Sequence, residues 1–154
     1  FFCNNANSAV ARSVWEAFRF DERLTGLEDM ELGKRFCGEG GRIGYVSSAC
    51  VYHIHDETWL QSRHRYDREA FALQRIMPEL NVRLYDCLRY FAVAVVLDFL
   101  AVIKSRMFLR EALGIMMFRS AQYIGTFKGS RRKGVLSKQQ KELYFYPTKS
   151  PQDH

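Results

Sequence analysis

Three stretches of the chain repeat apolar residues with a helical period. Residues 13–18 form a short helical pattern with Ser13 as a candidate N-cap. A second helix is predicted over 28–37, and three closely spaced glycines end it. A third is predicted over 58–76, because Pro78 disfavours helix at the residue before it. The first half of the chain therefore contributes at least three helices.

Between the second and third helices the period changes from about four residues to two. From Arg42 to His55 every second residue falls on one face, with Ile43, Tyr45 and Val51 among them. This alternation predicts an extended strand.

The segment from Tyr85 to Phe127 predicts two strongly apolar helices. Its first part, Tyr90 to Ile103, is interrupted only by Asp98. These fourteen residues reach ~21 Å as a helix, whereas a bilayer core is ~30 Å thick. We therefore expect no transmembrane span, and the two helices can pack as a hairpin, lie in a membrane surface or bury against a partner.

Composition indicates a globular chain the size of one domain. The 154 residues are 47% hydrophobic and 26% charged. The start has neither an initiator Met nor a signal peptide, so we expect a piece of a longer protein. The four cysteines lack short pairwise spacing, which argues against a zinc site or a disulfide framework and favours a cytoplasmic protein.

The net charge of +6 includes a run of six basic side chains without an acid from Lys128 to Lys141. Such a run can contact anionic lipid or nucleic acid, or remain solvated.

Residues 20–35 hold five carboxylates, of which Glu28 and Asp29 are the candidate site pair. Acids at a helix start are favoured by its dipole, which is the structural interpretation. In the functional one, one carboxylate accepts a proton from an attacking hydroxyl and the other holds a substrate hydroxyl. Asp21 and Glu22 are expected to shape the loop.

Two further clusters follow. His53 and His55, with Asp56, suit a metal or a diphosphate, or form a hydrogen-bonded strand end. Arg65 and Arg68 match phosphate oxygens, or belong to a solvated helix face. No phosphate-binding loop or dinucleotide fingerprint occurs.

Five segments, in order, resemble family 2 glycosyltransferases. They are the asparagine-rich start from Asn4, the Phe20–Arg35 acidic stretch, the strand-like Arg42–Val46, the Val51–His55 end and Tyr66–Ala70. The resemblance implies an α/β fold, namely the C-terminal part of a Rossmann-like GT-A domain at 1–80, followed by a helical, basic extension at 81–154. It also implies a preceding nucleotide-binding half, without which this fragment is expected to be inactive.

The resemblance implies an inverting transfer of a sugar from a nucleotide-sugar donor to a saccharide or lipid-linked acceptor, in cell-surface polysaccharide synthesis. Asp29 would be the general base, and a divalent Mn²⁺ or Mg²⁺ would be held by His53, with His55 as rival. The expected substrate contacts are Glu28, Asn7, Arg65 and Arg68.

Other expected properties are a cytoplasmic location and an anionic membrane surface as a partner of the tail. The alternative is a non-catalytic membrane-surface or partner-binding module. A nucleic-acid binder is least favoured, because the basic run lacks interleaved aromatic residues.

Overall fold

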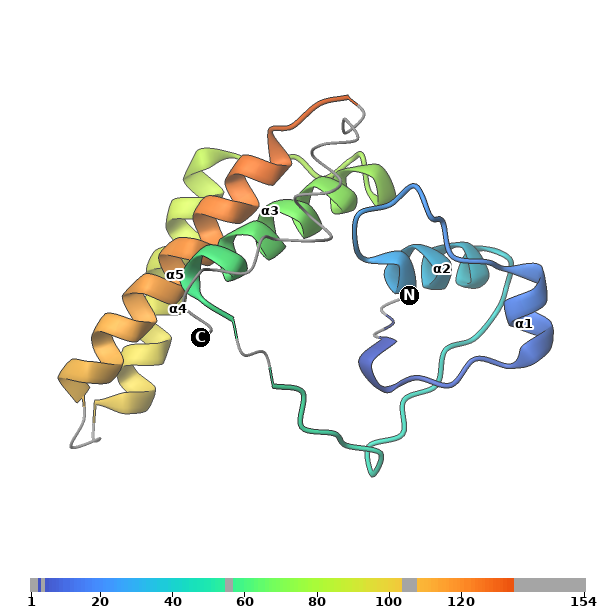
Figure 1. Cartoon of the computed structure of the whole chain (residues 1–154), viewed down its shortest axis with the longest axis horizontal. Coiled ribbons are helices and arrows are strands. Elements are labelled where there is room, and N and C mark those ends of the chain that lie inside the picture. Colours follow the sequence, from blue (N-terminus) through green and yellow to red (C-terminus); the bar gives the residue numbers. More distant parts are fainter. Residues whose placement is uncertain (1–2, 4, 55–56, 104–107, 135–154) are drawn as a thin grey trace, which may run out of the picture. The chain divides into compact units, whose positions relative to one another are not determined.

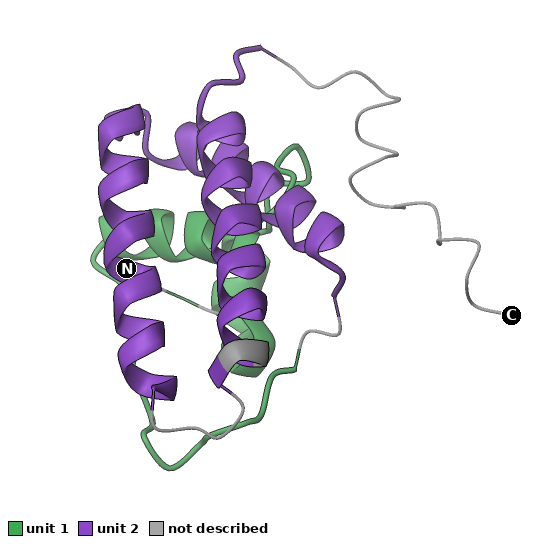
Figure 2. Cartoon of the chain, turned by 90° about the vertical axis from the view of Figure 1, so that its left-hand side faces the viewer, with its two compact units in different colours: residues 1–56 green, residues 57–154 purple. Residues whose placement is uncertain are grey.

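The computed structural model describes residues 3, 5–54, 57–103 and 108–134. Contacts between Cα atoms divide the chain into two compact units, Phe1–Asp56 and Glu57–His154 (Figure 2). The predicted domain boundary after residue 80 is a separate matter and stays a prediction.

The first unit contains a 3₁₀ turn, η1 (Asn5–Asn7), and two helices, α1 (Arg12–Ala17) and α2 (Glu28–Gly38) (Figure 1). Both helices were predicted, but the cap of α1 was not. Ala11 occupies the N-cap position and makes no side-chain cap, so the interpretation of Ser13 was wrong. A small aromatic cluster packs α1 and its following loop against α2, through the edge-to-face pairs Trp15–Phe20 and Phe18–Phe36.

The predicted strand and the α/β fold class were wrong. Within the described residues every regular element is a helix, and residues 42–54 form no strand. The alternating side chains of this segment bury no face, since Tyr45 is 73% and Val46 68% exposed. A period of two yields a strand only where a neighbouring strand completes the hydrogen-bond ladder, and no described segment does so. The described chain is thus not a Rossmann-like domain.

The second unit consists of α3 (Trp59–Ile76), α4 (Leu84–Val102) and α5 (Phe108–Ser130). The predictions of a helix over 58–76 and of two apolar helices after it are confirmed. Thr58 caps α3 with Gln61 in a reciprocal capping box, in which each side chain bonds the other residue's backbone N–H. This box fixes where α3 begins.

Helix α5 packs against both α3 and α4 (Figures 1 and 2). Buried residues of α3, among them Phe71 and Ala72, form most of the core of this unit. Between α4 and α5, Arg119 donates to both carboxylate oxygens of Asp98, at 2.7 and 2.9 Å. That hydrogen bond also lowers the pKa of Asp98. The one acid within the apolar stretch of α4 is therefore a link of the α4–α5 hairpin.

Candidate functional site

The loop of residues 20–27, which precedes α2, is held by two buried residues, and the chain then turns sharply into α2. Leu24 and Thr25 are almost fully buried, at 5% and 2% exposure. Leu27, the N-cap residue, adopts a left-handed backbone with φ of 60°. This turn places Glu28 and Asp29, both half-buried, in the first turn of α2, where unpaired N–H groups favour acids.

The left-handed residue gives a test of whether the loop stores backbone strain. A non-glycine residue in this region costs roughly 1–2 kcal/mol, so Leu27→Gly should leave the chain about 1 kcal/mol more stable than Leu27→Ala. Both variants lose the leucine side chain beyond Cβ, which removes most of its packing from the comparison. Urea denaturation of the two proteins measures the difference, and an alanine variant as stable as the glycine variant would contradict it.

Two segments of the predicted site, η1 and the start of α2, meet each other and the loop at Ala49. The Asp29 carboxylate accepts a hydrogen bond from the backbone N–H of Asn5 at 2.7 Å and another from that of Met30 at 2.8 Å. The side-chain amide of Asn7 donates to the carbonyl of Ala49 at 2.6 Å. The asparagine-rich start thus joins the first turn of α2 to the loop before His53.

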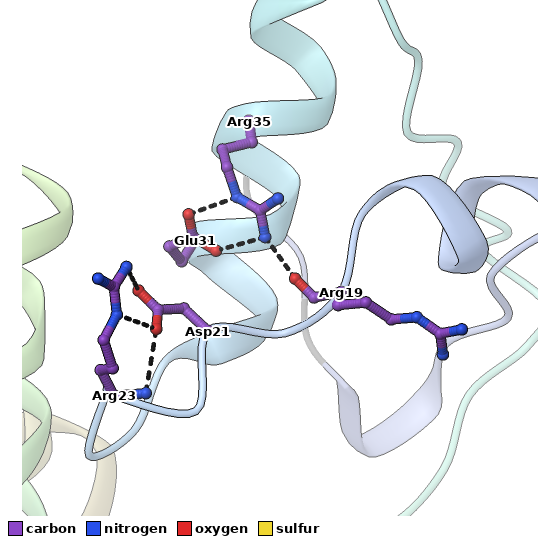
Figure 3. A network of polar contacts seen from close by, with 5 residues as sticks. All are labelled: Arg19, Asp21, Arg23, Glu31 and Arg35. Carbon is purple, nitrogen blue, oxygen red and sulfur yellow. Dashed lines mark hydrogen bonds and ion pairs between the residues drawn. The ribbon is translucent and has the colours of Figure 1, made fainter.

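Two other carboxylates of this region form ion pairs with arginines (Figure 3). Asp21 accepts from Arg23 at 2.8 Å, and these hydrogen bonds lower the pKa of Asp21 to about 2. Glu31 binds Arg35 through both oxygens, and Arg35 also donates to the carbonyl of Arg19. Asp21 and Glu31 therefore shape the loop and the helix, and Glu22 is exposed, which leaves Glu28 and Asp29 as the site pair.

The predicted metal ligands do not form a metal centre in the described part of the chain. His53 is exposed, and His55 and Asp56 lie outside the described residues. No group of three His, Cys, Asp or Glu side chains suited to a metal occurs among the residues that are described. The divalent cation stays a prediction.

The predicted phosphate contacts on α3 have structural partners. Arg65 donates to Glu57 at 2.9 and 3.0 Å, and its guanidinium also lies 3.5 Å from Glu69. Arg68 is half-buried on the same helix. Their roles in substrate binding stay predictions.

Sequence reasoning missed two features of the second unit. Asp67, only 2% exposed, accepts a hydrogen bond from Arg132 at 2.8 Å. Gly125 and Gly129 of α5 lie directly on the backbone of α3. Nothing local in the sequence indicates the ion pair, which joins residues 65 positions apart, but the four-residue glycine spacing is a known signal of close helix packing.

Comparisons with family models, with curated proteins and with solved structures found no match. No described helix is both long and apolar enough to cross a membrane.

Proposed function

We propose that residues 5–54 form the acceptor side of an inverting glycosyltransferase, with Asp29 as the general base. The observation that supports this is the meeting of η1, the first turn of α2 and the loop at Ala49, through the Asn5–Asp29 and Asn7–Ala49 hydrogen bonds. Two of the five segments that resemble family 2 glycosyltransferases, the asparagine-rich start and the acidic stretch, thus lie together, and they contact the loop between two others. The proposed membership of that family rests on those segments, and the proposed setting is polysaccharide synthesis at the cytoplasmic face of a cell membrane.

General-base catalysis requires a carboxylate that is fixed in orientation and can still accept a proton from the substrate. Two backbone N–H groups orient the Asp29 carboxylate, and each oxygen retains a lone pair. The acceptor hydroxyl would give its proton to Asp29 while its oxygen bonds the anomeric carbon and the bond from that carbon to the diphosphate breaks. Glu28 points about 100° away around the helix, so it and Asn7 would hold other hydroxyls of the acceptor.

The test is Asp29→Asn in the protein that carries this chain, assayed by transfer of labelled sugar from nucleotide-sugar donors. Loss of the base should lower turnover about 10²–10⁴-fold with an unchanged circular dichroism spectrum. Asp21→Asn, which removes a carboxylate of the same loop, is the matched control and should retain activity. Turnover of Asp29→Asn within tenfold of the parent would overturn the base assignment.

A second candidate function, a membrane-surface module, is favoured by the outer face of α4. One side of α4 packs on α5 and buries Cys87 and Val95. The other side exposes apolar residues, with Val96 at 54%, Leu97 at 60% and Leu100 at 61%. Residues 57–134 also carry fourteen basic and seven acidic side chains. An apolar helix face on a cationic unit complements the surface of an anionic bilayer.

Flotation with phosphatidylcholine vesicles, with and without phosphatidylserine, tests this candidate. Replacing Leu97 and Leu100 together by serine should abolish binding to the anionic vesicles. The control replaces Val46 and Val51 by serine, because these are exposed apolar residues of the first unit. Equal flotation of the two double variants would refute the docking face.

A further inference from the structure

An open pocket of about 740 Å³ lies at one end of the helical unit. It is bounded by the last turns of α3 with the segment that follows, and by the end of α5 with the residues just after it. This volume is in the range of small-molecule sites, ~300–1,000 Å³. Neither the proposed transfer nor the α4 face uses it.

The charge of the pocket wall is positive. Arg131 and Lys133 line it, and none of the described residues that line it is acidic; Glu79, in the neighbouring turn, is exposed and is not among them. Cations at helix C-termini often serve to balance the helix dipole and the last carbonyls. Here Arg75 donates to the carbonyl of Gly134 at 3.2 Å and Arg132 donates to the Asp67 carboxylate, so these two arginines of the same end have protein partners.

Arg131 and Lys133, in contrast, are available for a ligand. Arg131 lies over the ring of Phe127 at 5.3 Å, which positions its guanidinium without neutralising it. No ion pair is formed by Arg131 or Lys133 with any residue that the structure describes. Two cations beside one pocket, neither of them ion-paired with a described residue, attract an anion.

The rest of the lining suits an organic phosphate. The amides of Gln74 and Asn81 can donate to phosphate oxygens, as can a guanidinium and an ammonium. Ser130 donates its hydroxyl to the carbonyl of Phe127, so this hydrogen is not offered to a ligand. Pro78 and Leu80 supply an apolar wall, and the pocket is several times larger than a bare phosphate needs. We propose that this pocket binds a phosphate or diphosphate group attached to an apolar moiety.

The test uses the full chain and four probes: phenyl phosphate, pyrophosphate, and phosphatidylcholine vesicles with or without phosphatidic acid. Binding is followed by calorimetry for the soluble probes and by flotation for the vesicles. Amide NMR shifts of Gln74 and Asn81 report whether a soluble probe occupies the pocket. Replacing Arg131 and Lys133 together by glutamine should weaken binding at least tenfold. The control replaces two exposed arginines of the first unit, Arg12 and Arg42, by glutamine and removes the same charge.

The outcomes separate the sources of the phosphate. Binding of phenyl phosphate that depends on Arg131 and Lys133 indicates a soluble phosphate ester. Binding confined to vesicles with phosphatidic acid, with the same dependence, indicates a lipid headgroup, and the Leu97 and Leu100 variant distinguishes this from docking of α4. Equal weakening in the control variant, or no binding of any probe by the folded parent, would overturn the proposal.

Discussion

Gly129→Ala should destabilise the helical unit by about 1–3 kcal/mol or more, the typical cost of overpacking a tight contact. A Cβ at this position would overlap the carbonyl oxygen of Asp67 and come within 2.9 Å of the Ala70 Cβ. At Gly125 it would overlap the carbonyl of Arg63 and lie 3.1 Å from the Tyr66 Cβ. Four-residue spacing puts both glycines on one face of α5, where the backbones of α3 and α5 meet. Helix α3 would have to move away to admit either methyl group.

The same helix provides the control. Gly114 has open space where its Cβ would lie, so Gly114→Ala should stabilise the unit by up to about 1 kcal/mol through helix propensity alone. Replacing glycine by alanine in α5 is thus expected to lower stability at position 129 and to raise it at position 114.

The unit also contains a local reporter for this measurement. Trp59 of α3 makes an edge-to-face contact with Phe118 of α5, and the chain has one other tryptophan, Trp15, in the first unit. In a Trp15→Phe background, fluorescence during urea unfolding reports the α3–α5 interface. Equal stabilities of the Gly129→Ala and Gly114→Ala proteins would contradict the close crossing.

The helices were predictable because their signals are local. The capping box of Thr58 and Gln61 and the proline at 78 delimit α3 within a few residues, and these interactions need no distant partner. The alternation over 42–54 failed for the opposite reason. It states which side chains share a face but not whether another strand is present to pair with the backbone.

In the candidate site, too, local features could be predicted from the sequence and long-range contacts could not. Acids at the start of α2 follow from local helix chemistry, and the glycosyltransferase resemblance identified Asn7 and Asp29 as candidates. The contact of Asn5 with Asp29 spans 24 positions and that of Asn7 with Ala49 spans 42. Such contacts depend on tertiary packing. The left-handed backbone of Leu27 could not be predicted from the sequence either, since glycine or asparagine is the usual residue for that conformation.

Arg132→Leu should be the other strongly destabilising change, with a cost of about 3–5 kcal/mol, because it leaves a buried carboxylate without its cation. The Asp67 side chain is 3% exposed and that of Arg132 is 26% exposed. The second Asp67 oxygen, Oδ1, has no hydrogen-bond partner among the described residues. The guanidinium of Arg132 is therefore the main compensation for this charge.

A double-mutant cycle with Asp67→Asn isolates that charge. The asparagine amide is neutral, so removing Arg132 leaves no buried charge without a partner. In the Asp67→Asn background, Arg132→Leu should therefore lower the free energy of unfolding by at least about 1 kcal/mol less than in the parent. Trp59 fluorescence again measures unfolding. If the cost of Arg132→Leu were the same in both backgrounds, the arginine would act through packing of its aliphatic stem and not through Asp67. The pair would then join α3 to the end of α5 by contact area alone, as its neighbours Gly125 and Gly129 do.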